Sequence, residues 1–234
     1  MENITTTSAF ELVEKLKKGE ISSVDVCEAY IDRIKKFEKD VKAWVFFDKK
    51  LLLEKAKEKD EYRKSGKPLG PLHGLPIAVK DIIGTLDMPT ECGTVFRKKM
   101  SSSQDSEIVN LLKTAGAIVM GKTVTCELAY IHPSKTTNPH DYSRTPGGSS
   151  SGSAAVIASH MAHLSIGSQT GGSIIRPASY CGVVGYKPSY GLISRSGVLK
   201  TSEKLDTIGV FGKTVKDVAL LAKSLIKKDL YDPA

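Results

Sequence analysis

Apolar residues recur at helical spacing through the first part of the chain. The pattern predicts amphipathic helices over residues 8–20 and 23–38, and Ser8 and Ser23 stand where helix N-caps are expected. Residues 48–65 form a third segment of mixed charge, in which lysines and acids are interleaved as on the solvated face of a helix. We therefore expect the chain to begin with a helical segment.

Shorter apolar runs follow Pro71 and alternate with further helical segments. Strands are predicted at 75–81, 117–120 and 162–166, and helices at 106–115, 154–161 and 215–228. Helices that alternate with short buried strands indicate an α/β architecture. We expect one domain over residues 1–234, with the helical segment at 1–65 and the core at 71–212.

Two stretches rich in glycine and serine, at 147–155 and 171–178, interrupt this pattern. A flexible linker would continue with polar residues. Here the apolar run 154–158 follows directly on the first stretch, and Ile174-Ile175 lies within the second. Tight turns that present serines at the start of an apolar element favour a catalytic centre.

The composition argues against several classes of protein. The net charge of +8 comes from lysines interleaved with acids, so we do not expect a nucleic-acid partner. No apolar run approaches the ~18 residues of a membrane-spanning helix, and the N-terminus has no signal-peptide pattern, so we expect no membrane association. The four cysteines lack metal-binding spacing, which predicts reduced thiols, no bound metal and a cytoplasmic protein.

Residues 170–177 have the form of a loop that enters a helix. Gly171 and Gly172 permit backbone angles that are closed to other residues, and Pro177 suits the first turn of a helix. Ser173 then stands beside free backbone N–H groups, as acyl transfer requires of a nucleophile and its oxyanion donors. On this segment alone, a structural Gly-Gly turn with a capping serine is the favoured interpretation.

Other catalytic patterns fit the first glycine stretch less well. Gly148-x-Ser150-x-Gly152 matches the nucleophile elbow of α/β-hydrolases, but that elbow follows a buried strand, and a polar stretch broken by prolines precedes it here. A phosphate-binding loop would need Lys-Ser/Thr where the chain has Ser153-Ala154. We therefore discount both patterns.

Lys80 and His73 are the candidate bases. Lys80 ends an apolar run, so it either reaches solvent at a strand edge or is buried, in which case its pKa is lowered and it can act as a general base. His73 has no evident acidic partner for a Ser-His-Asp triad.

Four segments, in order along the chain, closely resemble the amidase signature family. They are the lysine segment 72–81, the glycine and serine stretches 147–155 and 167–173, and the segment 181–188. The resemblance implies an α/β fold with a mixed β-sheet core flanked by helices. It also implies hydrolysis of a small-molecule amide to a carboxylate and ammonia or an amine, with no cofactor.

The resemblance further implies a Ser-Ser-Lys triad, in which Ser173 is the nucleophile, Ser149 the bridging serine in an unusual cis peptide, and Lys80 the base. A neutral, buried Lys80 would take a proton through Ser149 from Ser173, which attacks the amide carbonyl. Backbone N–H groups from Thr170 to Ser173, including Gly171 and Gly172, would hold the oxyanion.

Three positions depart from the family's common pattern: Gln169 replaces an acid, Arg176 lies one place further along, and Ser151 replaces a glycine. We interpret them as marks of an amidase subgroup. The tRNA-dependent amidotransferase subunit of the family usually has an acidic segment rich in Met and Phe at the positions of residues 121–130, so we rank a free-standing amidase above it. An inactive fragment that keeps its glycine turns for structural reasons is the third alternative.

Family members are much longer than this chain, which resembles their N-terminal half. Residues 1–234 alone are therefore expected to expose an apolar face and an unpaired sheet edge, and to aggregate, form a homodimer or require a polypeptide that supplies the C-terminal half. Lys80 would then meet water and keep a pKa near ~10.4. Amide hydrolysis by these residues alone is expected to be poor or absent.

Overall fold

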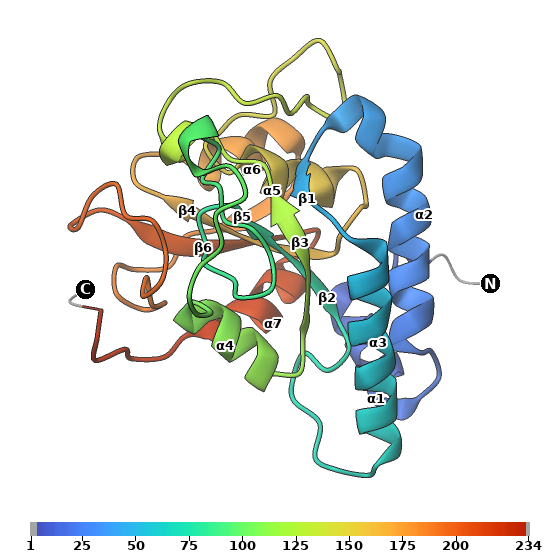
Figure 1. Cartoon of the computed structure of the whole chain (residues 1–234). Coiled ribbons are helices and arrows are strands. Elements are labelled where there is room, and N and C mark those ends of the chain that lie inside the picture. Colours follow the sequence, from blue (N-terminus) through green and yellow to red (C-terminus); the bar gives the residue numbers. More distant parts are fainter. Residues whose placement is uncertain (1–3, 233–234) are drawn as a thin grey trace.

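The computed structural model describes residues 4–232, and its centre is a six-stranded sheet with helices on both sides (Figure 1). The helices are α1 (Ala9–Lys18), α2 (Ser23–Val41), α3 (Lys49–Lys64), α4 (Glu107–Thr114), α5 (Ser151–Ala158), α6 (Ile175–Cys181) and α7 (Val215–Leu225). The strands are β1 (Trp44–Phe46), β2 (Pro76–Lys80), β3 (Ile118–Thr123), β4 (Leu164–Gln169), β5 (Val184–Tyr186) and β6 (Thr207–Gly212).

The sheet is mixed, with the strand order β1-β3-β2-β4-β6-β5. Strand β2 runs parallel to both β3 and β4, whereas β1, β6 and β5 pair antiparallel with their neighbours. Helices α5 and α6 lie on one side of the sheet and α4 and α7 on the other (Figure 1). The predicted α/β fold with a mixed sheet flanked by helices is confirmed.

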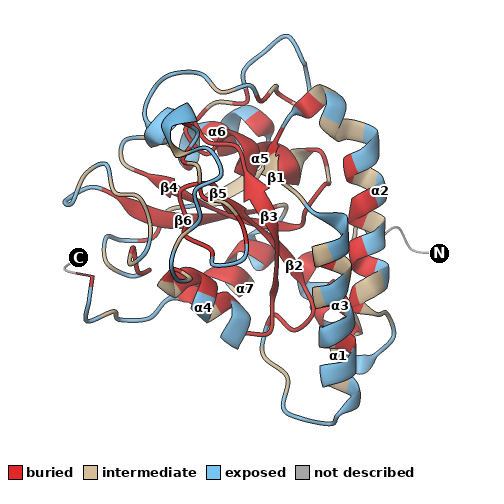
Figure 2. Cartoon of the chain, in the orientation of Figure 1, coloured by how far each residue is buried: buried red, intermediate tan, exposed pale blue. Residues whose placement is uncertain are grey.

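The central strands are buried over their whole length, whereas the outer sides of α2 and α3 are exposed (Figure 2). Burial on both faces explains why β2 and β3 appear in the sequence as continuous apolar runs rather than alternating ones. It also means that a lysine at the end of β2 is carried into the interior.

The helix caps test the sequence prediction at two serines. Ser8 caps α1 in a capping box, because its Oγ accepts from the Glu11 N–H at 3.2 Å. The prediction that Ser23 caps the second helix is wrong, because Ser22 is the N-cap of α2. Ser23 is the first helical residue, and its N–H donates to the Asp60 carboxylate of α3 at 2.7 Å.

Some boundaries and short strands also differ from the prediction. Strand β4 runs to Gln169, past the predicted end at residue 166, and α7 ends at Leu225. Strands β1, β5 and β6 were absent from the sequence prediction, since the first two have only three residues each and β6 contains two glycines. Their pairing with distant strands is not visible in a local pattern.

Helix α5 begins at Ser151, so the second half of the first glycine and serine stretch is helical. The reason lies in close packing. A Cβ at Gly152 would lie 2.4 Å from the Ala43 carbonyl oxygen and 2.5 Å from the Val124 nitrogen. The small residues therefore let this helix approach the backbone of the neighbouring segments.

Candidate functional site

Lys80 lies at the carboxyl end of β2, where the ends of the parallel strands β3 and β4 also meet. Its side chain is fully buried, with 0% exposed. Its Nζ donates hydrogen bonds to Ser149 Oγ at 2.8 Å and to Ser168 Oγ at 2.9 Å. The expectation that Lys80 meets water in this chain is therefore wrong, because the chain closes over it.

Burial lowers the pKa of Lys80 from 10.5 to about 7, while Cys126, Asp206 and Cys92 act in the opposite direction. The expected pKa near that of a free lysine is thus also wrong. With a pKa close to neutral, a substantial fraction of Lys80 is the neutral amine, which can accept a proton.

The serines of the first glycine and serine stretch have separate partners. Ser149, which follows a cis peptide bond from Gly148, accepts the Lys80 hydrogen bond. Ser150 is buried, and its Oγ donates to the Ser168 carbonyl at 3.1 Å and accepts from the Ser168 N–H at 3.3 Å. Ser153 Oγ donates to the Ile166 carbonyl at 3.0 Å, which ties α5 to β4.

These contacts weigh against the nucleophile elbow. Residues 138–150 contain isolated bridges but no strand, and the Ser150 hydroxyl is occupied by the backbone of β4. Of the two serines, Ser149 is the one whose hydroxyl meets a base.

Ser173 lies in the turn between β4 and α6, half-buried beside the exposed Gly171. Within residues 4–232, no hydrogen bond joins its hydroxyl to another group, so the structure brings Lys80 and Ser149 together without adding Ser173 to the hydrogen-bonded pair. Catalytic hydrogen bonds can tighten only when substrate binds. Within the same range, the backbone N–H groups of Gly171, Gly172 and Ser173 also have no acceptor.

Two functional candidates, Ser168 and Asp206, were missed by the sequence analysis. Ser168 shares the Lys80 ammonium with Ser149. The Asp206 carboxylate accepts from the Thr170 hydroxyl and from the Thr201 N–H at 2.6 Å, so it holds the first residue of the turn. The available signal was strand alternation, which separates Ser168 from Gln169, but it requires the true end of β4 to be known.

The histidines lie apart from this site. His73 is buried against Tyr62, with ring centroids 6.0 Å apart, and it makes no hydrogen bond to any residue named above. Its pKa is lowered by burial and by Lys59. Among the described residues, no group of three or more His, Cys, Asp or Glu side chains is placed to hold a metal ion.

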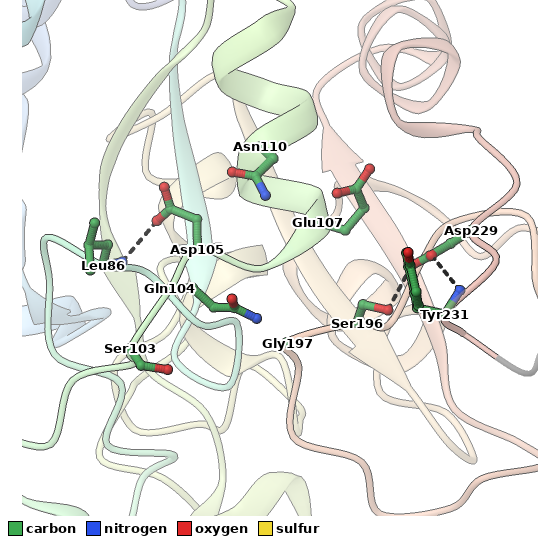
Figure 3. Close-up of a pocket in the computed structure, with 10 residues that line it drawn as sticks. All are labelled: Leu86, Ser103, Gln104, Asp105, Glu107, Asn110, Ser196, Gly197, Asp229 and Tyr231. Carbon is green, nitrogen blue, oxygen red and sulfur yellow. Dashed lines mark hydrogen bonds between the residues drawn. The ribbon is translucent and has the colours of Figure 1, made fainter.

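Two cavities differ in their relation to Lys80. The cavity of about 480 Å³ in Figure 3 lies between the start of α4 and the C-terminal segment, where Asp105 and Asp229 line it, and it contains none of the candidate residues. A smaller cavity of about 200 Å³ is lined by Gly148, Cys126, Arg176 and Tyr180. Because Gly148 precedes Ser149, this smaller cavity adjoins the candidate site.

Comparisons with known proteins agree on one family. A sequence profile named Amidase matches residues 25–234. The glutamyl-tRNA(Gln) amidotransferase A-chain protein of Carboxydothermus hydrogenoformans is 42% identical over 231 residues, covering 96% of this chain and 48% of that protein.

Solved structures agree on the fold as well. The native peptide amidase of Stenotrophomonas maltophilia superposes with a TM-score of 0.92 at 33% identity, covering 97% of this chain and 49% of that chain. An amidase family protein of Bacillus anthracis gives 0.92 at 33% identity, covering 99% and 49%. The chain thus spans about half the length of the relatives it matches. No helix in residues 4–232 is long and apolar enough to cross a membrane.

Proposed function

The chain belongs to the amidase family, and we propose that the protein hydrolyses amide bonds with Ser173 as nucleophile, Ser149 as proton relay and Lys80 as base. One observation carries the proposal. A fully buried lysine with its pKa lowered to about 7 donates to Ser149 Oγ at 2.8 Å, beside a turn that has free N–H donors. A purely structural Gly-Gly turn would not require a buried amine next to it.

The proposed reaction balances its protons within these three side chains. As Ser173 Oγ attacks the carbonyl carbon, its proton passes to Ser149 and the Ser149 proton passes to neutral Lys80. The N–H groups of Gly171, Gly172 and Ser173 hold the oxyanion that forms. The relay then returns the proton to the amide nitrogen, the C–N bond breaks, and ammonia or an amine leaves. Water hydrolyses the acyl-enzyme and releases the carboxylate.

The substrate in this proposal is a small-molecule carboxamide, and the site is placed in the core at 71–212 of a single domain whose helical segment is 1–65. We propose a cytoplasmic protein that pairs with a second copy or with a polypeptide supplying the C-terminal half of the family fold.

The test is acyl transfer by the purified natural protein. A panel of aryl and alkyl carboxamides should yield carboxylate and ammonia in equal amounts, and hydroxylamine should divert the acyl group into a hydroxamate. Absence of both products from every carboxamide, with folded protein, would overturn the proposal.

A second candidate is one component of a tRNA-dependent amidotransferase, which the 42% identity to the amidotransferase protein of Carboxydothermus hydrogenoformans favours. Native purification distinguishes the two. Such a component should copurify with another polypeptide and tRNA, and its carboxamide substrate should be glutamine. We rank the free-standing amidase first, because residues 121–130 lack the acidic, Met- and Phe-rich character usual for that component.

A further inference from the structure

Gln169, at the end of β4, holds the turn that carries Ser173 through three hydrogen bonds. Its Oε1 accepts from the Ile174 N–H at 2.9 Å and from the Ile175 N–H at 3.0 Å. Its Nε2 donates to the Gly171 carbonyl at 3.1 Å. The side chain therefore uses its acceptor and its donor on the same short turn.

The acceptor half of Gln169 replaces a missing helix cap. The N-cap residue of α6 is Ile174, whose side chain has no oxygen and makes no capping hydrogen bond. The first N–H groups of a helix have no partner within the helix, so Gln169 satisfies two donors that would otherwise be left open. A carboxylate could do the same.

The donor half is specific to the carboxamide. A carboxylate has no N–H, so an acid at position 169 would leave the Gly171 carbonyl without this partner and place a negative oxygen against it. Packing does not restrain the turn in its place, because Gly171 is exposed and a Cβ there would meet no atom within 4 Å.

The direction of the Gly171 carbonyl determines the direction of the next N–H. In a planar trans peptide, the C=O and the N–H point to opposite sides. With the Gly171 carbonyl held toward Gln169, the Gly172 N–H points away from it, and no residue in 4–232 accepts its hydrogen bond. The Gly172 carbonyl accepts from the Arg176 N–H at 2.9 Å, which fixes the Ser173 N–H in the same way.

We infer that Gln169 is a positioning residue for the proposed amide hydrolysis: its Nε2–H, through the Gly171 carbonyl, aims the Gly172 N–H at the developing oxyanion. The inference rests on the proposed function. It explains why an uncharged amide serves at a position where the family commonly has an acid.

The test compares Gln169→Glu and Gln169→Met with wild type in the whole natural protein, with Gln104→Glu as the matched control. Gln104 is exposed and lines the cavity in Figure 3, so its variant makes the same chemical change away from Lys80. Q169E keeps the cap for α6 and loses only the donor, whereas Q169M loses both.

For Q169E we expect kcat to fall about 100-fold at neutral pH, the loss typical of one oxyanion donor, with KM changed less than about threefold. The melting temperature should stay closer to wild type than that of Q169M. The ratio of Q169E to wild-type kcat should rise as the pH falls, because the introduced carboxyl group regains an O–H donor when it is protonated. Since both proteins contain Lys80, its titration cancels in that ratio. Q104E should match wild type.

The inference is overturned if Q169E retains wild-type kcat, if its loss is the same at every pH, or if Q169E fails to fold. Wild-type inactivity toward all carboxamides would instead count against the proposed function. In that case the labelling rate of Ser173 by a fluorophosphonate, which also places negative charge on an oxygen, tests Gln169 directly. Equal labelling of wild type and Q169E would overturn the inference.

Discussion

Lys80 and Asp81 are consecutive residues whose side chains enter two separate buried networks. Lys80 Nζ lies 2.8 Å from Ser149 Oγ, whereas Asp81 Oδ1 lies 3.8 Å from the Nζ of Lys122, the second fully buried lysine. Lys122 donates to the Ile83 carbonyl at 2.6 Å and to Thr90 Oγ1 at 2.7 Å. The two buried lysines therefore differ in role: one meets the candidate serines and the other holds the chain that follows β2.

Removing Lys122 alone should destabilise the protein strongly. Burial raises the pKa of Asp81 to about 6, so Lys122→Met would leave an acid without its cation in the interior. We expect a loss of about 3–5 kcal/mol in the free energy of unfolding, measured by urea denaturation. The double variant K122M/D81N should recover part of that loss. A K122M protein as stable as wild type would refute the pairing.

Ser173→Ala should abolish activity without unfolding the protein. Ser173 is half-buried and its hydroxyl makes no hydrogen bond in residues 4–232, so the fold does not depend on it. The loss in kcat should reach about 10⁴-fold or more, as for other nucleophile deletions. Ser150→Ala is the comparison, since Ser150 bonds only backbone of β4. An active S173A beside an inactive S150A would move the nucleophile to Ser150.

The pH dependence of activity should report the state of Lys80. Because burial lowers its pKa to about 7, kcat/KM should rise with pH up to about 7 and then level off. An activity limb near pH 10, as for a solvated lysine with a pKa of ~10.4, would contradict the assignment.

Stability should depend on the same group. Between about 7 and 10.5 the unfolded chain binds a proton that folded Lys80 does not, so the contribution of Lys80 to stability rises with pH across this window. The unfolding free energy of Lys80→Met relative to wild type should therefore fall as pH rises from about 7 to 10. The comparison with wild type cancels Lys122 and Lys213, which both proteins share. A flat difference would show that Lys80 titrates normally.

Gly152→Ala should destabilise the fold, because the added Cβ would meet backbone atoms 2.4 Å and 2.5 Å away at Ala43 and Val124. Overpacking of this kind typically costs about 1–3 kcal/mol. Gly171→Ala is the control for stability, since a Cβ there has open space. Equal melting temperatures for the two variants would show that α5 can move away.

A polypeptide of residues 1–234 should self-associate. Strand β5 is at one edge of the sheet, and beside it an apolar groove of about 440 Å³ is lined by Tyr186, Val215 and Ile226. Val215 is 72% exposed, so Val215→Lys should place charge in the groove and shift light scattering toward the monomer. A wild-type monomer at high concentration would contradict this expectation.

The local pattern of the sequence determined most of the helices and the central strands. Periodic apolar residues placed α1 to α4 and α7, and continuous apolar runs placed β2, β3 and β4, because burial on one helix face or on both sheet faces leaves a local record. Ser8 was identified as a cap, since capping depends on neighbouring residues. The motifs also picked out Lys80, Ser149 and Ser173 before any fold was known.

Tertiary structure alone decided which polar groups meet. Ser168 reaches Lys80 and Asp206 reaches Thr170 only because β4, β2 and β6 lie side by side, and their separations along the chain are 88 and 36 residues. The same holds for the pKa of Lys80, which depends on everything that excludes water from its ammonium. Gln169 shows the limit most clearly. Its sequence marks only a missing acid, while its two hydrogen-bonding halves acquire meaning when the turn folds back over the end of β4.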